Sequence, residues 1–261
     1  MPGFIIVALI GAVLSGISLA VFAPYVTLRR ISYMGEALSH IAFAGIAIAL
    51  ISGMNLTLGA WIFVSIVALL ISWLSRKEKI QEANTITIFL SLSMALGIVL
   101  ISLSKNYAFD LSSYLFGNVL LISISEVWAL GILNVFNILF ILIFYKELFY
   151  LSYNPEMAKV FRIRVGLIDH LFYLLLAANI VLNLKSAGII LVTAQLILPA
   201  VIAFNLAKKL GWIIAISVIA AIVSALIGFY LSFVLDIPTG ATIVIVQAFI
   251  YALSFIFKRR K

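Results

Sequence analysis

Cysteine is absent from this 261-residue sequence, and charged residues make up only 10% of it. Without cysteine the chain can form neither a disulfide bond nor a thiolate metal site of the zinc-finger kind. Soluble domains carry about 25% charged residues, so such a low fraction argues against a soluble fold. The sequence also lacks a GxxxxGK[ST] loop and an HExxH motif. These absences exclude ATP hydrolysis by a P-loop and zinc-protease chemistry of the HExxH type.

Hydrophobic residues, in contrast, make up 66% of the chain, against roughly 45–50% in soluble domains. A bilayer accepts this much apolar surface because lipid takes the place of water around each helix. The net charge of +8 comes from short basic clusters between apolar runs, a pattern typical of anchors at the membrane surface rather than of nucleic-acid binding. No linker-like stretch divides the chain. We therefore expect an all-α, polytopic integral membrane helical bundle that forms one domain over residues 1–261 and contacts lipid.

Nine apolar segments have about the length needed to cross ~30 Å of hydrocarbon. The boundary between the sixth and the seventh is marked only by Lys185 and Ser186, so eight spans is the alternative count. The nine expected segments are 4–28, 36–52, 56–74, 84–104, 127–145, 168–184, 187–206, 211–235 and 240–257.

The distribution of basic residues predicts the orientation. With nine spans and a cytoplasmic C-terminus, every lysine and arginine except Lys105 and Lys185 falls on the cytoplasmic side. This asymmetry is what the positive-inside rule expects. The uncharged N-terminus precedes a long apolar run, unlike a cleavable signal peptide, in which positive charge precedes a short one. We predict an outside N-terminus and a cytoplasmic C-terminus.

Two connections are long enough to have structure of their own. In the outer one, residues 105–126, the stretch 115–124 is apolar but too short to span, which suggests a re-entrant or interfacial segment. The inner one, residues 146–167, contains Asn154 followed by Pro155 and Glu156. Proline at the first helical position predicts a short cytoplasmic helix over about 155–163.

Glu36 and His40 stand out because ionisable residues at membrane depth are rare and usually functional. They lie four residues apart, which places both side chains on one helix face with Cβ atoms about 5–6 Å apart. A carboxylate oxygen and an imidazole nitrogen could then bind one divalent cation. A hydrogen-bonded Glu36–His40 packing pair is the alternative interpretation.

The other polar residues in or beside the apolar segments indicate a function less specifically. Gln195 lies one turn before the helix-kinking Pro199 and could line a transport pathway or bond a neighbouring helix. Asp169 and His170 are adjacent, face different directions on a helix, and are expected to be solvated at the membrane surface. Asp236 belongs to a turn with Pro238 and Gly240.

Five stretches in order along the chain resemble the metal-uptake ABC permeases, the membrane subunits of zinc and manganese importers. The first, LRRISYMGEALSHIAFAGIAIAL, resembles the family signature of an arginine pair, Gly-Asp/Glu-x-x-x-His and a small-residue helix. SSYLFGNVLLIS resembles the outer-loop element, and YKELFYLSYNPEMAKVFRI the cytoplasmic coupling region. SAGIILVTAQLILPAVIA resembles the Gly-x-x-Leu-Val-x-Ala stretch that ends in Pro-Ala, and LDIPTGATIVIVQA resembles the final loop and helix of the family. Together they cover nearly the whole chain.

The resemblance implies a permease subunit of an ATP-driven importer in a prokaryotic plasma membrane, not an enzyme. It implies a second permease copy in a homodimer, a cytoplasmic ABC ATPase and an extracytoplasmic metal-binding protein as partners. It places Glu36 and His40 in the transmembrane metal site and implies that the 155–163 helix docks into the ATPase. The coupling residues so implied are Asn154, Pro155, Glu156, Met157, Ala158, Val160 and Phe161.

The transported metal is not determined by two visible ligands. Zinc and manganese are both open, iron is possible, and we expect no permanently bound cofactor. Many members of the family carry Asp at the position of Glu36. The alternative function is a stand-alone secondary transporter or channel that is driven by a gradient and uses Glu36 and His40 as its ion site. An intramembrane enzyme is not supported, because the sequence offers neither a nucleophile–base pair nor a fuller metal site.

Overall fold

The computed structural model describes residues 3–77, 82–103, 117, 119–153 and 165–257, and all the regular elements within them are helices. This confirms the all-α prediction. The helices are α1 (Gly3–Ala20), α2 (Ala23–Leu28), α3 (Met34–Ser52), α4 (Leu56–Lys77), α5 (Glu82–Leu103), the 3₁₀ turn η1 (Val119–Leu121), α7 (Ile124–Ile143), α8 (Tyr145–Tyr153), α10 (Val165–Gln195), α11 (Leu198–Leu206), α12 (Leu210–Leu235) and α13 (Thr239–Ser254).

Each of the nine expected apolar segments falls on one or more of these helices. Seven helical stretches are long and apolar enough to cross a membrane within the described part of the chain. One of them, Gly166–Leu206, contains both the sixth and the seventh expected segments, and the ninth, Thr239–Ser254, is shorter than the others. The polytopic helical bundle is therefore confirmed, while the count of nine crossings and the orientation of the termini stay predictions.

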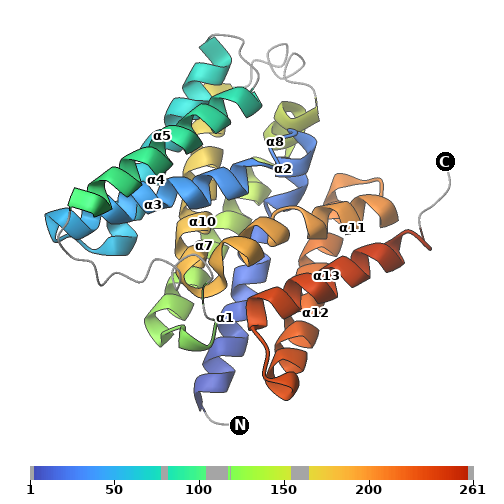
Figure 1. Ribbon diagram of the computed structural model, residues 1–261. Coiled ribbons are helices and arrows are strands. Elements are labelled where there is room, and N and C mark those ends of the chain that lie inside the picture. The colour runs from blue at the N-terminus through green and yellow to red at the C-terminus, as the bar shows by residue number, and fades with distance from the viewer. Residues whose placement is uncertain (1–2, 78–81, 104–116, 118, 154–164, 258–261) are drawn as a thin grey trace.

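The helix α10 changes direction at Gly188, two residues beyond the weak boundary at Lys185 and Ser186 that the sequence indicates. Gly188 has φ 74° and ψ 166°, a conformation outside the helical region that glycine adopts readily because it has no Cβ. A second interruption follows between Gln195 and Leu198, and Pro199 occupies the first turn of α11. Pro199 thus marks a helix start, where its missing N–H has no cost. Figure 1 shows the yellow ribbon of α10 giving way to the orange α11 on the right.

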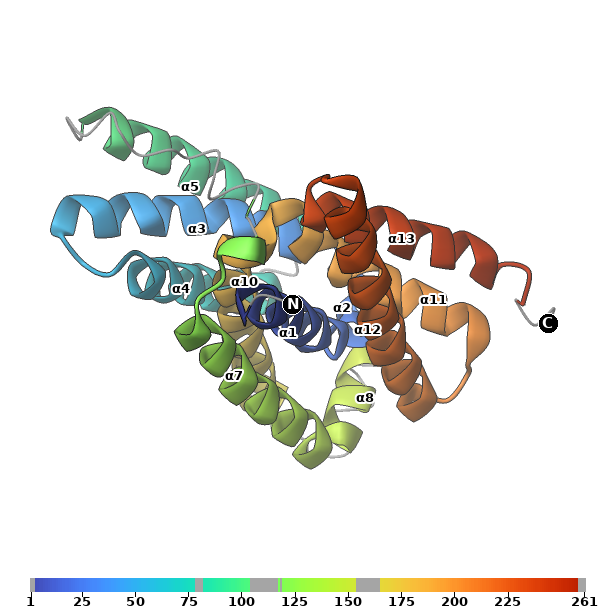
Figure 2. The same cartoon turned by 90° about the horizontal axis from the view of Figure 1, so that it is seen from below.

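The bundle has a centre and two flanks. Helices α1 and α10 form the centre, with α7 packed on both, and α10 contacts α1, α3, α4, α7, α8, α11 and α13. One flank consists of α3, α4 and α5, which pack on one another; the other consists of α11, α12 and α13. Seen from below, the two flanks lie on opposite sides of α1 (Figure 2). The metal-site candidates on α3 therefore belong to one flank, which α10 joins to the centre.

Helices α3 and α4 approach each other closely through small residues. A Cβ added at Gly45 would lie 2.8 Å from the Cα of Ala60, and one added at Gly59 would lie 2.5 Å from the Cβ of Ala49. Within a membrane, where lipid is as apolar as the side chains, such close van der Waals contact holds helices together. The glycines thus fix the position of α3 against α4.

The centre of the bundle is polar where α7 meets α10. The side-chain amides of Asn137 and Asn179 bond each other reciprocally at 2.8 and 3.1 Å, and both residues are fully buried. One turn further along α10, the amide of Asn183 donates to Ser18 of α1 at 3.0 Å. These bonds join α1, α7 and α10 in a region where an unsatisfied amide is costly.

We expect Asn137→Leu to lower the free energy of unfolding by about 1 kcal/mol, since hydrogen bonds between membrane helices contribute about 0.6 and at most ~1.7 kcal/mol. The single variant leaves the Asn179 amide oxygen without its donor. The double variant Asn137→Leu/Asn179→Leu removes both amides and should cost less than the sum of the two single changes. Reversible unfolding in mixed detergent micelles measures all four proteins, and additive losses would show that the amides are not coupled.

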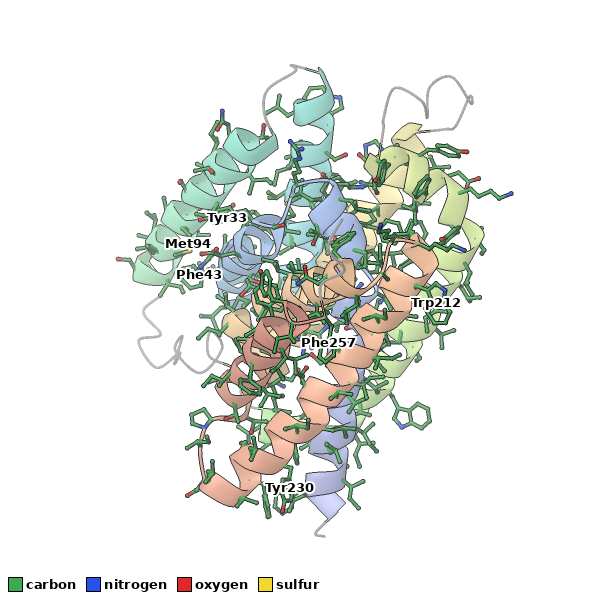
Figure 3. All side chains as sticks on the ribbon, turned by 90° about the vertical axis from the view of Figure 1, so that its right-hand side faces the viewer. Tyr33, Phe43, Met94, Trp212, Tyr230 and Phe257 are labelled. Carbon is green, nitrogen blue, oxygen red and sulfur yellow. The ribbon has the colours of Figure 1, made fainter. Side chains whose placement is uncertain are left out.

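Aromatic residues mark both ends of α12. Trp212 near its start and Tyr230 near its end are 65% and 63% exposed and point away from the bundle (Figure 3). Exposed Trp and Tyr at the two ends of an apolar helix are typical of the interfacial belts of membrane proteins.

The two long connections contain more helix than expected. Helix α7 begins at Ile124, three residues earlier than predicted, because Ser123 and Glu126 form a capping box there. Glu126 also accepts a hydrogen bond from Lys185 at 2.7 Å, which ties the start of α7 to α10. In the inner connection, the helix α8 occupies residues 145–153. The apolar stretch 115–124 is described only from 119 onward and at 117, where it forms η1 and leads into α7.

Candidate metal site

Glu36 and His40 lie near the start of α3. The preceding helix α2 ends at Leu28, Arg30 adopts a left-handed conformation with φ 60°, and α3 begins at Met34. Glu36 is therefore in the first turn of α3, where the positive end of the helix dipole stabilises a carboxylate. His40 follows one turn later on the same face, as the four-residue spacing predicts.

Neither side chain is bonded to the other. Glu36 and His40 are both half-buried, and neither makes a hydrogen bond or ion pair with any residue that the structure describes. The Nδ1 atom of His40 is buried and has no partner there. The hydrogen bond that the packing-pair interpretation requires is absent from this arrangement. A buried polar atom without a partner in the protein is commonly satisfied by water or an ion, and an imidazole nitrogen together with a carboxylate can bind a divalent cation.

The chain brings no third acidic or histidine side chain to this pair among the residues with described positions. No group of three or more His, Cys, Asp and Glu side chains is found in that part of the chain. Two ligands leave most positions of a divalent cation open, since Mn²⁺ favours about six oxygen or nitrogen ligands. A divalent cation bound to this pair would therefore need further ligands from elsewhere.

Close contacts on two sides hold the site helix in place. A Cβ added at Gly35 would lie 2.6 Å from Leu196 Cδ1, which belongs to the break between α10 and α11. One added at Gly97 of α5 would lie 2.6 Å from the ring of Phe43. Figure 3 shows Phe43 of α3 and Met94 of α5 on the same side of the molecule, one on each of these two helices. Because both contacts involve glycine, α3 cannot shift without moving its neighbours.

Gln195 is fully buried at the end of α10 and bonds other helices. Its amide oxygen accepts a hydrogen bond from Gln247 of α13 at 3.1 Å, and Gln247 also donates to Ser224 of α12 at 3.3 Å. The next residue, Leu196, contacts Gly35 of α3. Gln195 is therefore one residue away from a contact with the site helix. A role for Gln195 in lining the pathway stays a prediction.

The residues predicted to couple the chain to an ATPase, Asn154, Pro155, Glu156, Met157, Ala158, Val160 and Phe161, lie outside the described residues. The structure describes their flanks, α8 on one side and the start of α10 on the other.

A buried ion pair between these flanks and α2 was not predicted from the sequence. Arg29 donates a hydrogen bond to Asp169 at 2.5 Å, and the two side chains are only 9% and 13% exposed. The position of Arg29 in a basic cluster predicts a membrane anchor, and the position of Asp169 beside an apolar run predicts a solvated residue. Both interpretations are wrong in this respect, because a distance of 140 residues along the chain hides the pairing from any sequence pattern.

Comparisons with known proteins agree on one family. The model of the ABC 3 transport family matches residues 1–258. The manganese transport system membrane protein MntC of Listeria innocua is 38% identical over 255 residues, which cover 98% of this chain and 91% of the relative. The manganese import system permease protein ScaB of Streptococcus gordonii is 32% identical over 248 residues, 95% of this chain and 89% of the relative.

A solved structure has the same fold. The complex of PsaBC from Streptococcus pneumoniae with Fab includes a chain that superposes with a TM-score of 0.84 at 30% identity, over 97% of this chain and 91% of that one. The agreement extends over nearly the whole sequence in both kinds of comparison. The chain therefore belongs to the ABC 3 transport family.

Proposed function

We propose that this chain imports a divalent metal cation, with manganese as its main substrate, by way of Glu36 and His40. Family membership makes the chain a multi-pass permease subunit of an ABC importer in the plasma membrane, with ATP hydrolysis on a separate subunit. The observation that carries the metal assignment is the unpartnered Nδ1 of His40 beside an unpaired Glu36 carboxylate within the described residues.

The choice of manganese rests on ligand chemistry and on the relatives. Carboxylate, water and imidazole are suitable ligands for Mn²⁺, whereas thiolates, which select softer metals, cannot occur in a chain without cysteine. MntC and ScaB are named for manganese transport. Zinc is the second candidate, because a histidine ligand suits Zn²⁺ equally well.

A second copy of the chain would complete the site. The described part of one chain offers only two ligands, and both are half-buried on an accessible helix face. Two copies related by a two-fold axis would bring four such side chains together. A modest affinity suits a transporter, because an ion that binds too tightly is not released. An extracytoplasmic binding protein would deliver the ion, and the ATPase would dock on residues 155–163.

Reconstitution tests this function directly. Proteoliposomes that contain this chain, its cognate ATPase and its binding protein should accumulate Mn²⁺ only when ATP is present, and Zn²⁺ and Fe²⁺ more slowly. Metal content is measured by mass spectrometry after filtration. Zn²⁺ uptake faster than Mn²⁺ uptake would reassign the substrate. Uptake by this chain without the ATPase would instead establish the gradient-driven transporter.

A further inference from the structure

The Arg29 guanidinium is the meeting point of four helices. Arg29 directly follows α2, and its Nη1 atom donates to Asp169 of α10. Its Nε atom donates to Ser152 of α8 at 3.2 Å. The second carboxylate oxygen of Asp169 accepts a hydrogen bond from Ser72 of α4 at 3.1 Å. The guanidinium carbon also lies 4.1 Å from the centre of the Phe172 ring, within the range of a cation–π contact. One side chain thus links α2 and α8 to α10, and through Asp169 to α4.

This arrangement is more specific than stability requires. A buried ion pair gains little net stability, because removing both charges from water costs about as much as their attraction returns. Apolar residues of similar size would hold the same helices together at least as well. The planar guanidinium, in contrast, fixes the direction of each bond it makes. The pair therefore fixes how these helix ends are oriented relative to one another, in addition to holding them together.

The location of the pair connects two functional regions. Ser152 belongs to the last turn of α8, and Asp169 to the beginning of α10. These two helices flank the stretch 154–164, which contains the predicted docking residues. Arg29 itself lies seven residues before Glu36, and α3 begins five residues after it. A single side chain is thus bonded to both flanks of the predicted docking stretch and is joined by a short connection to the site helix.

We propose that Arg29 and Asp169 are a positioning pair that transmits the movement of the ATPase to Glu36 and His40; this rests on the proposed function. When the ATPase displaces the ends of α8 and α10, the guanidinium follows them and carries the displacement through the short connection 30–33 into the start of α3. The Nη2 atom of Arg29 is buried and lacks a partner among the described residues. This unused N–H can donate a hydrogen bond to a new oxygen when the helix ends rearrange, which gives the pair a second stable arrangement.

The double variant Arg29→Met/Asp169→Leu separates coupling from stability. It replaces the ion pair with apolar side chains and leaves no unpaired charge, so the complex with the ATPase should assemble normally. In the reconstituted importer we expect ATP hydrolysis to continue, while the number of metal ions taken up per ATP falls about tenfold, the range of known coupling effects. Ser152→Ala keeps the ion pair and releases only α8, and should lower the same ratio by about twofold.

Arg30→Met is the matched control, because Arg30 is the exposed neighbour of Arg29 and should keep the wild-type ratio. A wild-type ratio in both the double variant and Ser152→Ala would overturn the proposal. So would a parallel loss of hydrolysis and uptake in the double variant together with an unchanged ratio in Ser152→Ala, since the pair would then be purely structural. Failure of the proposed function itself is distinguishable, because the wild-type importer would then show no ATP-dependent metal uptake.

Discussion

Glu36→Gln and His40→Ala are each expected to reduce ATP-dependent Mn²⁺ uptake by about 100-fold or more, because loss of a mere supporting residue at a metal site already costs about 10–100-fold. Each change removes one of the two proposed ligands, while Gln and Ala preserve the helix. Uptake in proteoliposomes gives the effect, and co-purification with the ATPase shows that the complex is intact. Glu36→Asp keeps the carboxylate and should retain most of the activity.

The chain provides matched controls for these changes. His170 is its other histidine and bonds the Gly166 carbonyl near the start of α10. Glu126 is an acidic residue in the first turn of α7, paired with Lys185 in an exposed ion pair that contributes little to stability. His170→Ala and Glu126→Gln should both leave uptake near the wild-type rate. Uptake that survives both Glu36→Gln and His40→Ala would place the metal site elsewhere in the same fold.

Gly45→Ala is expected to lower the free energy of unfolding by about 2 kcal/mol, the cost of inserting a methyl group into a packed interface. The added Cβ would lie 2.8 Å from Ala60 Cα, 2.9 Å from Phe63 Cβ and 3.0 Å from the Gly59 carbonyl oxygen. Backbone atoms cannot yield as a flexible side chain can, so α3 must move away from α4. Since α3 carries Glu36 and His40, metal uptake should fall together with stability.

The same substitution at Gly131 of α7 should have the opposite sign. No atom lies within 4 Å of a Cβ added there, so Gly131→Ala keeps only the gain in helix propensity, up to about 1 kcal/mol. Unfolding in mixed micelles measures both variants under identical conditions. Equal effects at Gly45 and Gly131 would show that α3 and α4 are not in close contact.

Much of the fold was predictable because lipid imposes simple rules on sequence. Each long apolar run became helix, and Pro199 began a new one, since backbone groups in hydrocarbon must be satisfied within the chain. The pair Glu36 and His40 was recognisable because four-residue spacing alone places two side chains on one face. The start of α7 could also have been found from the Ser123 and Glu126 capping box.

Features that depend on contacts between distant segments were not predictable. The bend of α10 is at Gly188, where a Cβ added at Gly117 would lie 2.3 Å from the backbone nitrogen, and only the folded chain brings these two glycines together. The bonds of Arg29 to Asp169 and of Asn137 to Asn179 likewise join helices far apart in sequence. A single sequence does not distinguish a basic residue that faces lipid headgroups from one that faces a buried carboxylate, because both lie beside an apolar run.

The aromatic ends of α12 have a consequence for the lipid around the protein. Trp212 and Tyr230 are separated by 18 residues of helix, or about 27 Å, and both face outward. Bilayers of about this hydrocarbon thickness accommodate both rings at headgroup level, whereas thicker ones require local thinning and thinner ones require α12 to tilt. Tilting α12 would strain α11 and α13, which pack on it, and through Gln247 the buried end of α10. The acyl-chain length of the host membrane thus determines how much strain the bilayer places on the interior of the permease.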